Sequence, residues 1–133
     1  MPPGRATIRP LFLLLGVAAG ITISRRWLDV VEVRGESMAP SLRPGDRLVV
    51  ESRSYTRRAP REGEVVLAAD PREPARELVK RVATVDDSSS TAVLRGDAPG
   101  ASTDSRDFGA VPLAEIRWRV ALRYWPPDRA GGL

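Results

Sequence analysis

The sequence predicts a mainly β domain, a compact antiparallel and barrel-like fold, with one hydrophobic helix at its N-terminus. From residue 29 onward, short segments rich in Val and Leu are separated by Gly, Pro and Asp turns. Residues 116–124 alternate apolar and mostly arginine side chains with the period of two expected of a strand. Residues 10–24 form an uncharged apolar run. The 133 residues suit one domain, and we divide them into a basic leader and membrane anchor (1–28), a β domain (29–125) and a loose tail (126–133).

The apolar run at 10–24 is short for a membrane span. It is flanked by Arg9 and by Arg25 and Arg26, whereas a spanning helix needs about 20 apolar residues. The flanking arginines can extend toward the membrane interface, and Trp27 suits an interfacial position. We therefore predict a single-pass anchor in contact with lipid. A cleavable signal peptide ending at 17–19 and a buried helix are the alternatives, and arginines on both flanks leave the orientation open.

Six short strands are predicted after Trp27. The arginine-rich stretch 52–62 and the proline-containing stretch 70–77 predict exposed loops, and 96–109 is irregular and rich in Gly, Pro, Ser and Asp. Many short strands with such turns are typical of an all-β antiparallel domain. The predicted strands are 29–33, 48–50, 65–68, 78–85, 91–94 and 116–124.

Composition excludes several chemistries. The chain has no histidine and no cysteine, which excludes a Ser-His-Asp triad, a cysteine nucleophile and a thiolate or imidazole zinc site. We expect no cofactor and no metal. The net charge of +4 suits an anionic membrane surface. Because no basic run is interleaved with aromatic residues, nucleic acid is not an expected partner. The sequence does not indicate an oligomeric state.

Ser37 occupies a turn with a restricted backbone. Glycine precedes it at Gly35, prolines follow at Pro40 and Pro44, and a Gly-Asp turn ends the stretch at Asp46. Glycine permits sharp turns and proline fixes φ, so Ser37 is predicted to lie on a rigid turn between two strands. The alternative is a proline-stiffened turn that carries an incidental serine.

Lys80 is the one lysine in a chain with 21 lysines and arginines. Arginine stays protonated in proteins, whereas a desolvated lysine can become a neutral base. Within a strand, Lys80 shares a face with Leu78 and Val82, which places the amine against an apolar surface. Without histidine, Ser37 and Lys80 form the one conventional pair of hydroxyl nucleophile and base. Alternatively, Lys80 extends to solvent from a strand edge.

Four segments of the sequence, in the same order, resemble the motifs of type I signal peptidases. The resemblance spans roughly residues 30–120 and implies a mostly β catalytic domain on a membrane anchor. One such motif is weak by itself, but four in order are specific. The segments are Gly35-Glu-Ser-Met-Ala-Pro-Ser-Leu42, Pro44-Gly-Asp46 with Leu48-Val-Val50, Leu78-Val-Lys-Arg-Val82, and Gly96-Asp97 with Ser102-Thr-Asp-Ser-Arg106 and Gly109.

The resemblance implies a role for each matching residue. Ser37 would be the nucleophile, with its N–H donating to the oxyanion, and Lys80 would be the general base. Ser102 would orient the lysine amine. The substrate, a precursor protein, would bind as an extended strand with small residues at −1 and −3 before the cut. Residues that would support the site are Gly35, Met38, Pro40, Ser102 and the ion pair of Asp104 with Arg106.

The predicted function is that of a membrane-associated serine endopeptidase with a Ser–Lys dyad, which removes an N-terminal signal or propeptide. Gly35 stands where some members have a serine that assists the oxyanion hole, and Ala98 replaces the usual Asn.

The compact size and the ending 123–126 also resemble the nickel-type superoxide dismutase maturation proteases, which is one alternative. Self-cleaving repressors share Gly-x-Ser-Met, but residues 1–29 leave no room for their DNA-binding domain.

An alternative of another class is an inactive peptide-binding β module on a membrane tether. The expected location is the cell membrane, with the catalytic domain on the extracytoplasmic side. The maturation subtype would permit the cytoplasmic face.

Overall fold

Seven strands form one sheet in residues 26–133, the part of the chain that the computed structural model describes. The predicted hydrophobic helix and anchor at 10–24 lie outside these residues. Within 26–133, no helix combines the length and the apolar character that a membrane crossing requires. The strands are β1 (Leu28–Glu32), β2 (Arg47–Glu51), β3 (Val65–Asp70), β4 (Glu73–Asp86), β5 (Thr91–Arg95), β6 (Val111–Pro112) and β7 (Ile116–Trp125).

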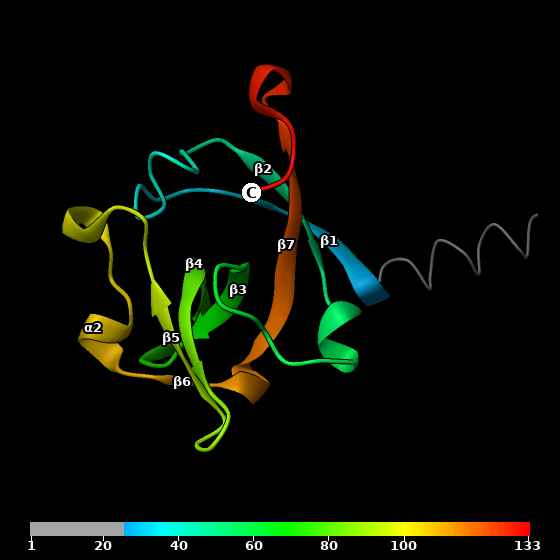
Figure 1. Cartoon of the computed structure of the whole chain (residues 1–133). Coiled ribbons are helices and arrows are strands. Elements are labelled where there is room, and N and C mark those ends of the chain that lie inside the picture. Colours follow the sequence, from blue (N-terminus) through cyan, green and yellow to red (C-terminus); the bar gives the residue numbers. More distant parts are fainter. Residues whose placement is uncertain (1–25) are drawn as a thin grey trace, which may run out of the picture.

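The sheet is antiparallel and open. Its order is β1-β2-β7-β3-β4-β5-β6, so the long strand β7 joins the β1–β2 pair to β3 and its neighbours (Figure 1). Register shifts at Arg47/Leu48 and Val49/Val50 of β2, and at Leu67/Ala68 of β3, interrupt the pairing with β7. Such bulges increase local twist and bend the sheet. The mainly β antiparallel class is thus confirmed, but the sheet does not close into a barrel.

One predicted loop is part of a strand. The stretch 70–77 carries two prolines and is predicted to be an exposed loop, yet β4 begins at Glu73. Asp70 pairs with Glu73 and Ala69 with Glu77 across the hairpin, so strand pairing outweighs the prolines at this exposed end. The remaining elements are short helical turns: η1 (Ser54–Thr56), η2 (Pro99–Ala101), α2 (Ser105–Phe108), η3 (Leu113–Glu115) and η4 (Pro127–Arg129).

Two hydrophobic clusters share the strand β3. Consecutive residues Val65 and Val66 contribute to different clusters, because successive side chains of a strand point to opposite faces. The first cluster extends under the turn that carries Ser37, and its buried members are Val33, Met38, Leu42, Leu48, Val50, Val65 and Val120. The second contains Val66, Ala68, Val82, Ala92, Leu94, Val111 and Ile116.

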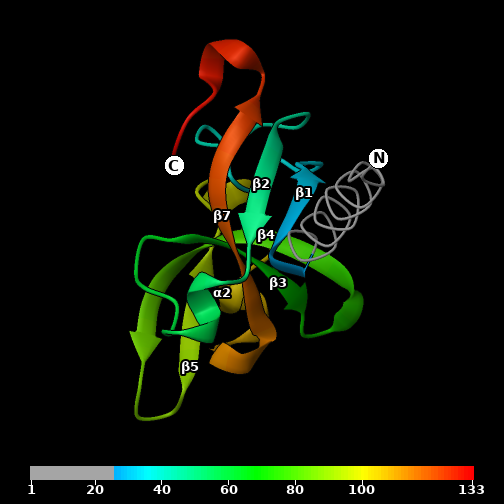
Figure 2. The same cartoon turned by 90° about the vertical axis from the view of Figure 1, so that its right-hand side faces the viewer.

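The last residues of the chain, predicted as a loose tail, fold back onto β7 (Figure 2). Gly131 and Arg123 exchange two backbone hydrogen bonds of 2.8 Å each. The guanidinium of Arg129 pairs with Asp46, whose side chain is buried. A buried carboxylate needs a partner, and the returning tail supplies one.

Candidate active site

Ser37 lies in a loop of residues 33–46, here named the serine loop. Its two ends are joined by hydrogen bonds of 2.8 Å from the Val33 N–H to the Asp46 carbonyl and from the Gly45 N–H to the Val33 carbonyl. Between these ends, Met38 and Leu42 are buried in the first hydrophobic cluster. The loop is therefore fixed at its ends and along its length, which leaves Ser37 little freedom to move.

Asp46 connects the serine loop to the C-terminal end of the chain. Its carboxylate accepts from the Arg43 N–H at 2.9 Å and from Arg123 at 3.3 Å, and it pairs with Arg129. Arg123 also donates to the Ser41 carbonyl at 2.7 Å. The sequence indicated only a Gly-Asp turn here. The two arginines lie so far along the chain that no local signal could have assigned them to this carboxylate.

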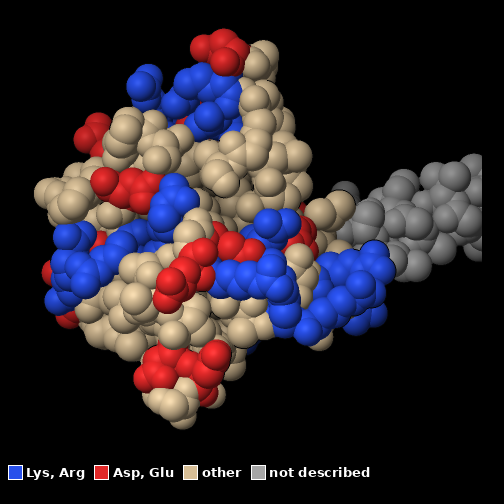
Figure 3. Space-filling view, in the orientation of Figure 1, with Lys and Arg blue, Asp and Glu red and all other residues tan. Residues whose placement is uncertain are grey.

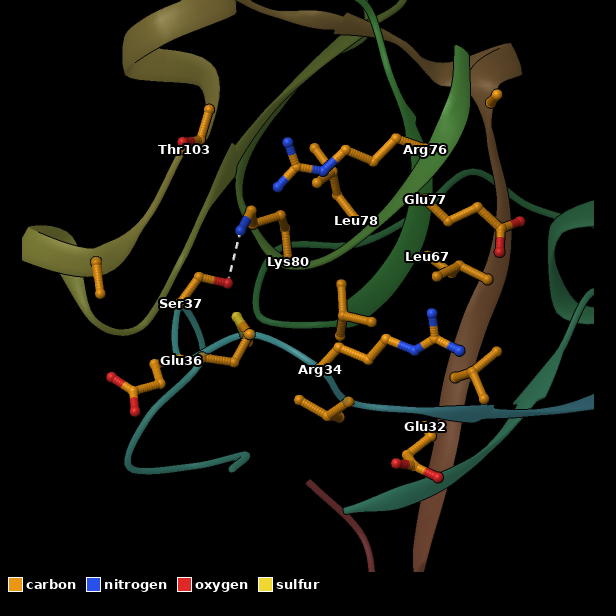
Figure 4. Close-up of a pocket in the computed structure, with 17 residues that line it drawn as sticks. Glu32, Arg34, Glu36, Ser37, Leu67, Arg76, Glu77, Leu78, Lys80 and Thr103 are labelled. Carbon is orange, nitrogen blue, oxygen red and sulfur yellow. Dashed lines mark hydrogen bonds between the residues drawn. The ribbon is translucent and has the colours of Figure 1, made fainter. Parts of the chain in front are cut away.

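Lys80 on β4 points toward Ser37. Its amine donates to the Ser37 hydroxyl, with 2.7 Å between Nζ and Oγ (Figure 4). The side chain is 3% exposed and lies between buried Leu78 and Val82. Burial lowers the pKa of Lys80; Arg76 and Arg106 lower it further, while Asp104 opposes the shift. The structure thus brings together the hydroxyl and the amine that sequence analysis singled out.

The segment after β5 contacts the backbone of Ser37. The Ala98 N–H donates to the Ser37 carbonyl at 2.9 Å. The Ser102 hydroxyl donates to Asp104 at 2.8 Å, and among residues 26–133 it makes no hydrogen bond to Lys80. A Cβ added at Gly96 would lie 2.1 Å from Ser102 Oγ and 2.5 Å from the Ser37 carbonyl oxygen. Glycine is the residue that permits this close approach.

Asp104 is the buried centre of this segment. It has no exposed surface, and its carboxylate accepts hydrogen bonds from Arg106 Nε at 2.9 Å and from Arg106 Nη2 at 2.6 Å. The Gly96 N–H adds a third donor at 2.9 Å. Although burial favours the neutral form, these donors together hold the pKa of Asp104 well below its usual range. The carboxylate therefore stays ionised and holds Gly96, Ser102 and Arg106 around itself.

A cleft of about 650 Å³ opens over Ser37 and Lys80. One wall is residues 31–38 and the other is residues 75–80 of β4, with Leu67, Ala101 and Thr103 completing it. Gly35 and Met38 line the cleft, and a Cβ added at Gly35 would meet no atom within 4 Å. Pro40 and Ser102 do not line it. Charged residues of both signs surround the pair, among them Arg34, Glu36, Arg76 and Glu77 (Figure 4).

Comparison with known sequences assigns the family. The sequence model of signal peptidase, peptidase S26, matches residues 5–86. The chain belongs to the signal peptidase family. This family match includes Ser37 and Lys80 but not the 96–109 segment, whose contacts come from the structure.

Relatives of this signal peptidase family member carry protease names. It is 34% identical over 127 residues to the "Mitochondrial ATP-independent inner membrane protease subunit 1a" of Arabidopsis thaliana, covering 80% of this chain and 76% of the relative. It is 33% identical over 123 residues to "Mitochondrial inner membrane protease subunit 1" of Xenopus tropicalis, covering 79% and 74%. Identity to subunit 2 of Danio rerio is 27% over 135 residues, covering 86% and 74%. Family and relatives thus support a peptidase.

Proposed function

We propose that this protein is a membrane-associated serine endopeptidase in which Ser37 is the nucleophile and Lys80 the general base. The observation that carries the proposal is the 2.7 Å contact between the Lys80 amine and the Ser37 hydroxyl, with the lysine 3% exposed. A desolvated amine loses its proton more readily than one in water. A serine hydroxyl is a weak nucleophile until a neighbouring base accepts its proton.

The reaction begins when Ser37 Oγ attacks the carbonyl carbon of the scissile peptide and neutral Lys80 accepts the hydroxyl proton. The tetrahedral intermediate collapses as the C–N bond breaks, and Lys80 returns the proton to the leaving amine. This leaves an ester between Ser37 and the N-terminal part of the substrate. Water then attacks the ester while Lys80 accepts its proton, and the second collapse releases the acid and restores the serine hydroxyl.

The oxyanion donor that we assign is the Ser37 N–H, which donates no hydrogen bond within residues 26–133. A backbone donor of this kind typically contributes about 2.7–4 kcal/mol to transition-state stabilisation. The Ala98 N–H bonded to the Ser37 carbonyl holds the same backbone from the other side. Gly35 contributes no side chain to the oxyanion, so stabilisation relies on the backbone and on water.

The substrate that we propose is a precursor protein, bound as an extended segment that loses its N-terminal signal or propeptide. The cleft supports this assignment because one of its walls is a strand with a free edge. Residues 75–80 of β4 pair with β3 and have no strand partner on their other side within residues 26–133, and extended peptides bind by adding to such edges. The relatives' names support association with a membrane, where residues 10–24 would be the anchor. These relatives do not favour the nickel superoxide dismutase subtype.

The test is cleavage of a secretory precursor by the full-length protein in detergent, beside Ser37→Ala and Lys80→Met. Met has nearly the length of Lys and keeps the buried site filled. We expect wild type to cut and both variants to lose activity, while Ser88→Ala in the exposed turn after β4 cuts normally. Labelling of Ser37 by a serine-acylating penem provides a readout that needs no substrate. A protein that neither cuts nor becomes acylated would be a peptide-binding module instead.

A further inference from the structure

A second hollow, of about 390 Å³, lies on the surface around η1. Figure 3 shows basic side chains gathered over η1 and the start of β1. This hollow shares no lining residue with the cleft over Ser37. Its walls are Glu51, Arg53, Ser54, Arg57, Arg58 and Arg119.

The charge of this hollow is not balanced. Arg119 pairs with Glu51 at 2.8 Å, and Arg58 pairs with Glu64 at 2.5 Å. These carboxylates hold two of the guanidinium groups in place. Arg53 and Arg57 are exposed and take part in no ion pair among residues 26–133. Two positive charges therefore remain available to an anion from solution.

The hollow lies close to the point where the apolar run 10–24 joins the domain. The Ser52 N–H donates to the Trp27 carbonyl at 3.0 Å, and the Ser52 hydroxyl donates to the Arg26 carbonyl at 3.4 Å. Arg26 follows the apolar run by two positions. If that run enters a bilayer, these bonds keep the segment before η1 close to the point where the chain leaves it.

We propose that the η1 hollow binds the phosphate group of an anionic phospholipid. Guanidinium groups bind phosphate oxygens through paired hydrogen bonds, and two unbalanced arginines match one such headgroup. Nucleic acid fits less well, because its binding relies on an extended basic track with aromatic stacking. The aromatic residue of η1, Tyr55, is instead hydrogen bonded to Glu64 at 2.9 Å. Lipid binding here would fix the domain on the membrane and does not depend on peptidase activity.

The experiment titrates phosphatidylglycerol into the full-length protein in neutral detergent that contains phosphatidylcholine, and counts bound lipid by native mass spectrometry. Each basic side chain near an anionic surface contributes about a factor of five in affinity, so Arg53→Gln with Arg57→Gln should weaken binding about 30-fold. The matched control, Arg43→Gln with Arg95→Gln, removes two exposed arginines elsewhere and should change binding less than twofold.

Two further arms distinguish the sources of phosphate. Inorganic phosphate or a short single-stranded oligonucleotide should not displace the lipid at equal concentration. Displacement by either would overturn the assignment to a lipid headgroup. Equal binding by wild type and the Arg53/Arg57 variant would overturn the site itself, as would an equal loss in both double variants. Unchanged melting temperatures of both variants establish that any loss is not due to unfolding.

Discussion

Substitution of Gly96 by Ala tests whether the segment after β5 fixes the backbone of Ser37. The new Cβ would lie 2.5 Å from the Ser37 carbonyl oxygen and from Ser102 Cβ, and 2.1 Å from Ser102 Oγ. Ser102 cannot move away at no cost, because its hydroxyl donates to buried Asp104. The Ser37 carbonyl accepts from Ala98, so the backbone must shift on one side or the other.

The expected cost follows from these contacts. Overpacking in a filled region destabilises a protein by ~1–3 kcal/mol, and replacing Gly by Ala recovers ~0.4–1 kcal/mol by restricting the unfolded chain. The net loss of unfolding free energy should be about 1–2 kcal/mol, or roughly 4–8 °C in Tm for a domain of this size. Misplacement of a reacting group by about 1 Å can cost 10²-fold in rate. Because Gly96→Ala displaces the backbone of Ser37, acylation of Ser37 should slow by at least about tenfold.

The assays are thermal unfolding and the rate of penem acylation, both on the full-length protein. Gly100→Ala is the matched control, because a Cβ at Gly100 meets no atom within 4 Å. It should leave the acylation rate unchanged and should not lower Tm, since without a clash Gly→Ala only restricts the unfolded chain. If Gly96→Ala unfolds and acylates as wild type does, the close approach of Gly96 to Ser37 is wrong. A loss of stability with an unchanged acylation rate would show that the strain does not reach Ser37.

Four other predictions concern the buried charged residues and their partners. Acylation of Ser37 should rise with pH through the lowered pKa of Lys80, and a rate independent of pH would contradict a lysine base. Lys80→Met should have a higher unfolding free energy than wild type, because it removes the cost of burying a charged amine. This gain should be complete below the folded-state pKa of Lys80 and should disappear above about pH 10.4, the pKa of an unfolded lysine. Urea titrations at several pH values measure it. Asp104→Ala should lose about 3 kcal/mol of unfolding free energy at neutral pH. The difference from wild type should shrink as pH falls below about 3.9, because the stabilisation from a lowered carboxyl pKa is full above the unfolded pKa and is lost as pH falls toward the folded-state pKa. Arg129→Ala should cost about 1–2 kcal/mol by removing a partner of Asp46, and an unchanged urea midpoint would mean that the tail does not hold the serine loop.

The sequence by itself determined the features that depend on neighbouring residues. Alternation along 116–124 predicted β7, and turn residues between apolar segments predicted five of the other strands. Glycines and prolines indicated a fixed turn at Ser37, and the solitary lysine indicated a candidate base. Each of these signals is local, because side-chain period and backbone restriction operate over a few residues.

Only the tertiary structure decided what meets across the sheet. Ser37 and Lys80 are 43 positions apart, and their contact depends on the register of β4 against β3 and on the closure of the serine loop by Asp46. The partners of Asp46, at Arg123 and Arg129, lie 77 and 83 positions away. Packing of the whole chain likewise sets the order of the strands and the return of the tail. It also leaves the sheet open, with β1 and β6 as its two edges. Pairing between distant segments leaves no periodic trace in the sequence of either one, which is why these contacts could not be predicted from it.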